Sequence, residues 1–202
     1  MSLENRLETT AAAIGAAFAG RSLPKKDPVF ASGSPELDSD HLLALARQHG
    51  WRDLPWTSLC ANSIALALAT PAGFAYFLPA CMTASLKHYA QCGSLTSMIL
   101  TCLTPDDEGD SETMAELERD FESLEPGFLG EGSSSGIFAE SEGMREEFEE
   151  RIAPLTGEEK AAVRVYLKYL DEVHGDDFPA FGPREALERF WADAERGDGQ
   201  RP

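Results

Sequence analysis

The segment TPAGFAYFLPAC, residues 70–81, gives the clearest prediction of secondary structure, because it starts a helix with a continuous apolar stripe. Thr70 followed by Pro71 has the form of a helix N-cap with proline at the first helical position. Pro79 lies inside the pattern, which predicts that the helix kinks or restarts there. The predicted apolar stripe consists of Phe74, Phe77, Leu78 and Cys81.

This helix lies within a longer segment, Leu54 to Leu86, that contains no charged residue. The segment is long enough to cross a bilayer. However, polar and proline residues interrupt it, and no Lys/Arg-rich flank sets an orientation. We therefore expect no membrane span but two buried helices that are separated at Thr70-Pro71, the first of them running from about Ser58 to Ala69.

Apolar residues elsewhere in the chain also recur at helical spacing, and no alternating strand pattern of useful length occurs. Thr156 and Glu159 form a capping box just before the best-formed of these patterns. We therefore predict an all-α fold of about seven to nine helices in a single compact domain over residues 1–202. The predicted helical stripes include Leu7, Ala11, Ile14 and Phe18; Met114, Leu117, Phe121 and Leu124; Met144, Phe148 and Ile152; Val163, Tyr166, Leu167, Leu170 and Val173; and Leu187, Phe190, Trp191 and Ala194.

Charge is distributed unevenly along the chain. Residues 1–103 carry seven acidic and seven basic side chains, whereas residues 104–150 carry 17 acidic and two basic ones. Residues 151–202 add a net charge of -3, which completes the total of -18. The domain thus has a near-neutral apolar part, an acidic segment with a flexible loop at 126–136, and C-terminal helices. Such a field attracts basic surfaces and repels nucleic acid and anionic lipid, and we expect the 12 arginines and five lysines to form no patch.

The cysteines form no metal or redox motif. Cys60, Cys81, Cys92 and Cys102 lie in the apolar part, and none of them makes a C-x-x-C pair. Cysteine among Ala, Leu and Met behaves as a small hydrophobe, so we expect four reduced core residues in a cytoplasmic protein. The N-terminal stretch has no basic region ahead of its apolar part and makes a poor signal peptide.

No candidate for catalysis or metal binding fits its template. A calcium loop counted from Asp106 needs Gly at position 6 and Glu at position 12, where the chain has Ser111 and Leu117. His88 and Cys92 could share a helix face, but no third ligand is evident, and a surface or capping role is the simpler interpretation of His88. The chain has no nucleophile elbow, P-loop or dinucleotide motif. We therefore expect no cofactor, no metal and no enzyme activity.

Three elements of the sequence occur together in a familiar order. Trp56 and Leu59, followed by residues 70–80, resemble a T-P-x-x-F-x-Y-[YF]-L-P core. Residues 155–167 resemble a second element, and Phe190-Trp191 a third. Together they resemble an uncharacterised bacterial family of small helical proteins, a domain of unknown function. The resemblance implies a bacterial, cytosolic protein and supplies no activity.

The charge distribution favours a non-enzymatic binding protein whose acidic helices, at about 106–124 and 142–150, dock on a basic protein partner. Immunity proteins against nuclease-like bacterial toxins use such charge to associate fast and to block a basic active site, which makes a toxin effector a candidate partner. The predicted partner-binding residues are Asp106, Asp107, Glu108, Asp110, Glu112, Glu116, Glu142, Glu146, Glu149 and Glu150.

Two other interpretations stay open. The first is a small-ligand binder or enzyme with a pocket beside Tyr76, near the Thr70–Ala80 motif, lined by polar groups such as Asn62, His88 and Tyr166. The second is that the charge only keeps the protein soluble.

Overall fold

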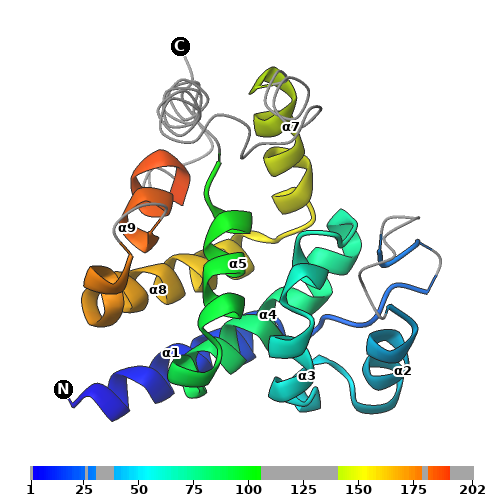
Figure 1. The fold of residues 1–202 in the computed structure, drawn as a ribbon, viewed down its shortest axis with the longest axis horizontal. Coiled ribbons are helices and arrows are strands. Elements are labelled where there is room, and N and C mark those ends of the chain that lie inside the picture. Colours follow the sequence, from blue (N-terminus) through cyan, green and yellow to red (C-terminus); the bar gives the residue numbers. More distant parts are fainter. Residues whose placement is uncertain (1, 26, 31–38, 106–140, 179–181, 192–202) are drawn as a thin grey trace, which may run out of the picture.

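A computed structural model of the chain describes residues 2–25, 27–30, 39–105, 141–178 and 182–191, and for residues 39–40 and 141–144 it describes the backbone only. Within these ranges all regular structure is helical (Figure 1), and the only extended pairing is an isolated bridge between Phe30 and Ala69. The predicted all-α fold is confirmed. The acidic helix predicted at about 106–124 and the loop predicted at 126–136 lie outside the described residues.

The central helix is α4 (Pro71–Lys87), and most of its side chains are buried. Thr70 is its N-cap, as predicted, and the threonine side chain accepts a hydrogen bond from the Gly73 N–H at 3.2 Å. The helix runs through Pro79 without restarting, so of the two predicted outcomes, a kink or a restart, the restart is wrong. Proline inside a helix costs about 3 kcal/mol, and burial of the large apolar side chains on either side of Pro79 recovers more than that.

The start of α4 packs unusually close to the chain that follows α1. The Thr70 N–H donates to the Val29 carbonyl at 3.0 Å, and the Thr70 hydroxyl donates to the Pro28 carbonyl at 2.6 Å. A Cβ atom at Gly73 would lie 2.0 Å from the Val29 carbonyl oxygen, far inside van der Waals contact. Glycine at this position of the motif is therefore required by the approach of two backbones.

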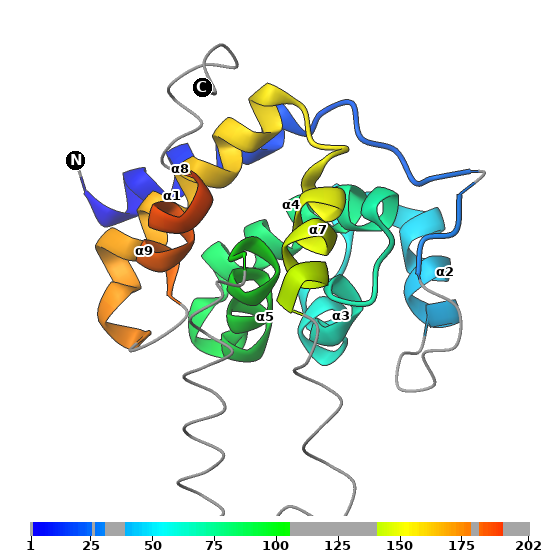
Figure 2. The same cartoon turned by 90° about the horizontal axis from the view of Figure 1, so that it is seen from above.

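Helices α1 (Leu3–Ala17) and α8 (Gly157–His174) run side by side although they come from opposite ends of the chain (Figure 1 and Figure 2). The predicted capping box starts α8: the Glu159 N–H donates to the Thr156 hydroxyl, and the Thr156 N–H donates to the Glu159 carboxylate at 2.8 Å. Arg21, which follows α1, forms an ion pair with Glu159 and donates one hydrogen bond to each oxygen of its carboxylate. The pair ties the end of α1 to the start of α8.

The single helix predicted from about Ser58 to Ala69 is two shorter elements. The α-helix ends at Ala61 because Asn62 leaves helical geometry, with φ -120° and ψ 41°, and its side-chain amide donates to the Ser58 carbonyl at 2.9 Å. Asparagine offers the backbone such a local alternative to helix continuation. The elements of this part of the chain are α2 (Ser39–His49), η1 (Trp51–Asp53), α3 (Trp56–Ala61), η2 (Ser63–Leu66), η3 (Tyr89–Gln91) and α5 (Gly93–Leu103).

The C-terminal elements close over the end of α5. They are α7 (Ser141–Ile152), η4 (Gly175–Asp177), α9 (Pro183–Ala186) and the π-helical turn η5 (Leu187–Trp191). The Trp191 indole N–H donates to the Leu103 carbonyl at 2.7 Å, and Arg189 donates to the Pro105 carbonyl at 3.1 Å. These bonds satisfy carbonyls at the end of α5 that have no partner within their own helix.

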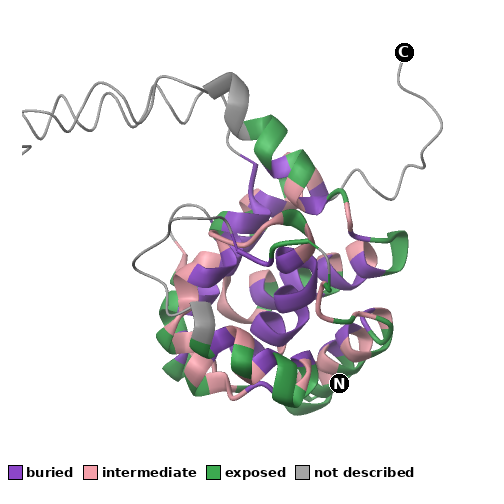
Figure 3. Cartoon of the chain, turned by 90° about the vertical axis from the view of Figure 1, so that its right-hand side faces the viewer, coloured by how far each residue is buried: buried purple, intermediate pink, exposed green. Residues whose placement is uncertain are grey.

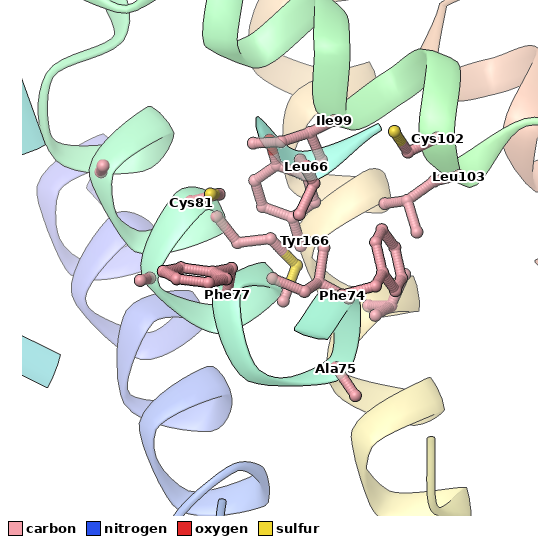
Figure 4. Packing of buried hydrophobic residues seen from close by; sticks show 14 of the residues in the cluster. Leu66, Phe74, Ala75, Phe77, Cys81, Ile99, Cys102, Leu103 and Tyr166 are labelled. Atoms are coloured by element: carbon pink, nitrogen blue, oxygen red, sulfur yellow. The ribbon is translucent and has the colours of Figure 1, made fainter. Parts of the chain in front are cut away.

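One hydrophobic core contains buried residues from Ile14 to Trp191. Figure 4 shows its centre, where Phe74 and Cys81 of α4 meet Leu66, Ile99 of α5 and Tyr166 of α8. Inside the core, the Ser85 hydroxyl is bonded to both Thr96 and the Tyr166 hydroxyl, each at 2.9 Å. Among the described helices, none has both the length and the apolar character that a bilayer crossing requires.

Candidate functional site

The predicted partner-binding residues lie partly outside the described ranges. Those in the 106–140 range are not described, and for Glu142 only the backbone is described. Glu146, Glu149 and Glu150 lie on α7 and are exposed, as is their neighbour Glu147. The residues outside the described ranges are Asp106, Asp107, Glu108, Asp110, Glu112 and Glu116.

The face of α7 opposite its exposed glutamates is apolar and buried in the core. Phe148 and Ile152 are 3% and 2% exposed, and the Phe148 ring packs edge-on against Phe190 with 5.0 Å between ring centroids. Glu149 has an ion pair with Arg145 at 3.6 Å, in which both side chains are more than half exposed. Such a pair contributes little stability. Figure 3 shows exposed residues on α7, at the top of the molecule, where the helix projects from the buried core.

A cavity of about 660 Å³ opens beside Tyr76, where the chain after α1 meets the end of α2 and the turn η1. Its lining residues are Arg21 to Lys25, Ala46, Arg47, His49, Gly50, Trp51, Arg52, Asp53 and Tyr76. The Tyr76 hydroxyl donates to the Ala46 carbonyl at 3.2 Å, which fixes α2 to the central helix. Burial raises the pKa of Tyr76, so the hydroxyl stays protonated and remains a donor.

The sequence-based interpretation placed different residues around such a pocket, and that assignment was wrong. Tyr166 is fully buried and bonded to Ser85, and His88 stacks on Trp56 with 4.3 Å between ring centroids. The Asn62 amide donates to the Ser58 carbonyl of its own helix. None of Asn62, His88 and Tyr166 lines the cavity beside Tyr76.

The cavity gathers basic side chains, contrary to the expectation that the cations form no patch. Arg21, Lys25, Arg47 and Arg52 contribute to its lining, and Asp53 is the one acidic residue among the lining residues. Lys25 and Arg47 are exposed and make no hydrogen bond or ion pair within the described part of the chain. Sequence reasoning missed the cluster because its members are up to 31 positions apart and meet only in the folded chain.

Trp51 forms part of the cavity wall and carries an unsatisfied donor. The side chain is 6% exposed, and its indole Nε1 is buried with no hydrogen-bond partner. The Arg52 guanidinium lies over the indole ring, 4.6 Å from its centroid, and donates to the Gly15 carbonyl at 2.8 Å. A buried N–H without an acceptor costs about 1–3 kcal/mol, and this N–H is closed off from solvent.

Two of the four cysteines are free core residues, as expected, and the other two are not. Cys60 and Cys92 form a disulfide across 32 residues, so the prediction of four reduced cysteines was wrong. Nothing in the sequence indicated this pairing, since spacing does not determine disulfide connectivity. Cys81 and Cys102 are free and buried, and burial raises the pKa of Cys81 to about 12 and that of Cys102 to about 11. Neither thiol is a nucleophile near neutral pH.

The paired metal ligands considered at His88 and Cys92 are not available as a pair, because the Cys92 sulfur is in the disulfide. Within the described ranges, no group of three or more His, Cys, Asp and Glu side chains is placed to hold a metal ion. His174 ends α8, stacks on Tyr89 with 3.5 Å between ring centroids, and lies 3.4 Å from the Asp177 carboxylate.

Comparison with known proteins gives a family but no function. No curated protein and no solved structure matches the chain. Residues 14–126 match the group described as Family of unknown function (DUF6714). That region includes the Thr70–Ala80 core, whereas the elements at 155–167 and Phe190-Trp191 lie outside it. Since the matched region is more than half of the 202-residue chain, the protein belongs to this family of unknown function.

Proposed function

We propose that this protein is a non-enzymatic binding protein whose acidic surface docks on a basic protein partner. The observation that carries the proposal is the acidic surface of α7, where Glu146, Glu147, Glu149 and Glu150 are exposed and the opposite, apolar face of the helix is buried. Of these four side chains, three make no ion pair with a described residue. Their charge is therefore available to a partner.

The proposed comparison with an immunity protein rests on the rate of association. A concentrated field of one sign raises the association rate for an oppositely charged surface by about 10- to 1,000-fold at low salt. An inhibitor of a bacterial toxin needs such fast association, and a nuclease-like toxin offers a basic active site to cover. A toxin effector is therefore our proposed partner.

The test starts from the partner itself. The full chain is used to capture proteins from its source organism, and the basic partner is purified and its association rate measured at 50 and 300 mM salt. We expect the Glu146→Gln, Glu149→Gln and Glu150→Gln triple variant to associate about tenfold more slowly at low salt. The difference should largely disappear at high salt because the field is screened.

A matched control separates a docking surface from a mere excess of charge. Glu4 and Glu8 on α1 and Asp176 in η4 are exposed and lie on elements remote from α7 (Figure 1). Changing all three to the corresponding amides removes the same charge and should slow association less than twofold. Equal slowing by both triple variants, or none by either, would instead support a charge that only maintains solubility.

A second candidate function, the small-ligand binder, is supported by a separate observation. The cavity beside Tyr76 has a volume within the range of about 300–1,000 Å³ that is typical of small-molecule sites. None of the α7 glutamates lines it. The two functions can therefore coexist in one molecule and be tested independently.

We retain a bacterial cytoplasmic location as part of the proposal, on the family resemblance. The Cys60–Cys92 disulfide is typical of oxidising compartments instead. Cells lysed in the presence of an alkylating reagent decide between the two. Four alkylated cysteines after denaturation would support the cytoplasm, and two would overturn that location.

A further inference from the structure

The cavity beside Tyr76 presents positive charge that the acidic residues of its lining do not neutralise. Arg21 is paired with the buried Glu159 carboxylate and so adds little net charge. Lys25, Arg47 and Arg52 remain, opposed among the lining residues by Asp53 alone. The cavity thus has a net charge of about +2 within a chain whose total is -18.

The arrangement around the end of α2 leaves this charge accessible. Carbonyls at a helix C-terminus repel an anion. Here the Ala46 carbonyl already accepts hydrogen bonds from the Gly50 N–H at 3.1 Å and from the Tyr76 hydroxyl. Arg47, in the last turn of α2, further compensates the negative end of the helix. An anion in the cavity therefore meets the cationic side chain of Arg47 and an Ala46 carbonyl that is already hydrogen-bonded.

Trp51 and Arg52 are held together at the wall of the cavity. The Arg52 guanidinium lies over the indole ring, 4.6 Å from its centroid, and donates to the Gly15 carbonyl. These contacts place a cation at the wall while the Arg52 side chain remains exposed.

The charge and the size of the cavity together select a class of anion. A phosphate monoester carries about -1.5 to -2 at neutral pH, which matches the charge of the cavity, whereas a carboxylate carries only one charge. Guanidinium groups bind phosphate through paired N–H donors. A volume of about 660 Å³ exceeds what a phosphate alone requires, and Leu23, Pro24 and the Trp51 ring offer an apolar surface to an organic part.

We propose that this cavity binds a small organic phosphate, with Arg47, Arg52 and Lys25 holding the phosphate group and the Trp51 side chain forming part of the wall. The assignment rests on the second candidate function, the small-ligand binder, and it names the ligand class. It does not depend on the docking of α7 to a protein.

Calorimetric titration of the full chain with four probes tests the ligand class. Phenyl phosphate should bind at least tenfold more tightly than benzoate, and benzyl alcohol should show no binding; inorganic phosphate reports the contribution of the organic part. Benzoate or benzyl alcohol binding as tightly as phenyl phosphate would overturn the phosphate assignment while leaving a small-ligand binder. No binding of any probe would overturn the phosphate assignment and count against the ligand binder as well.

Three variants test the residues. Arg47→Gln and Lys25→Gln should each weaken phenyl phosphate about tenfold, the loss expected for one hydrogen bond between charged groups. Lys87→Gln is the matched control, because Lys87 is exposed, ends α4 and does not line the cavity; it should change the affinity less than twofold. Equal effects of Arg47→Gln and Lys87→Gln would mean that only the overall charge affects binding, which would overturn the proposed site.

The Trp51 indole N–H resonance reports whether the phosphate enters this cavity, because Trp51 is one of its lining residues. The chain has three tryptophans, and the signal missing from the Trp51→Phe spectrum identifies Trp51. That signal should shift with phenyl phosphate while the other two stay in place. A Trp51 signal that does not move at saturation would overturn the proposed location, and melting curves of each variant confirm that it is folded.

Discussion

Replacing Arg21 by methionine should destabilise the protein in a pH-dependent way. Glu159 is 3% exposed, and Arg21 gives it two hydrogen bonds and a counter-charge. Removing one partner of a buried ion pair costs about 3–5 kcal/mol. Since the Arg21 side chain is 24% exposed and the Thr156 N–H still donates to Glu159, we expect about 2–4 kcal/mol.

The sign of the pH dependence follows from the carboxyl group. Burial pushes the pKa of Glu159 up, but the hydrogen bonds from Arg21 and Thr156 outweigh burial and hold the pKa below its usual value. The pair therefore stabilises the wild-type protein above about pH 4.3 and loses its effect as the pH falls through the lowered pKa. Without Arg21, burial raises the pKa of Glu159. Protonation of Glu159 at low pH therefore reduces the loss of stability of the Arg21→Met variant.

The assay is urea or thermal unfolding at pH 7 and pH 4. A loss of about 2–4 kcal/mol corresponds to a Tm lower by about 4–16 °C at pH 7, and the gap should shrink at pH 4. The double variant Arg21→Met, Glu159→Gln should recover part of the loss, because no buried charge is left unpaired. Arg47→Met, at an exposed arginine, is the control and should cost less than about 0.5 kcal/mol.

Two results would refute this reasoning. One is an Arg21→Met variant within about 1 kcal/mol of the wild type at pH 7, which would mean that water solvates Glu159 in place of Arg21. The other is an equal gap at pH 7 and pH 4, which would mean that the loss comes from packing and not from the ion pair.

Three further changes test the packing. Gly73→Ala should destabilise by about 1–3 kcal/mol or more through backbone overlap, whereas Gly15→Ala, with open space in α1, should stabilise by about 0.5–1 kcal/mol in urea unfolding; equal effects would exclude the overlap. Reduction of the Cys60–Cys92 bond should cost about 3–4 kcal/mol for its 32-residue separation, and an unchanged Tm in dithiothreitol would contradict it. Trp191→Phe should cost about 1–3 kcal/mol through its lost indole hydrogen bond; a neutral result would show that the bond adds nothing.

Local sequence signals predicted the starts of helices correctly where all the interacting residues lie within one short segment. The capping box of Thr156 and Glu159 and the N-cap at Thr70 were correct because their partners lie three residues apart. The helix predicted from Ser58 to Ala69 failed at Asn62, where a side-chain hydrogen bond competes with the helix. Continuity of α4 through Pro79 depends on burial, which a local pattern does not contain.

The candidate sites were less predictable because their causes are tertiary. The exposure of Glu146, Glu149 and Glu150 follows from the helical period around Phe148. The basic cavity does not, since Arg21 and Arg52 come from different elements and meet only after folding. The disulfide was hidden for the same reason, in cysteines that look like ordinary small hydrophobes.

The neighbouring positions of α1 and α8 also determine when the chain can finish folding during its synthesis. A ribosome adds about 5–20 residues per second, so α1 waits roughly 10–30 s for α8 to emerge. Helix α4 can pack on α1 during that interval, but the part of α1 that contacts α8 is uncovered and open to chaperones and to aggregation. The family-matched region begins near the end of α1 and ends before α8, so a fragment cut to residues 14–126 would lack the packing of α1 on α8.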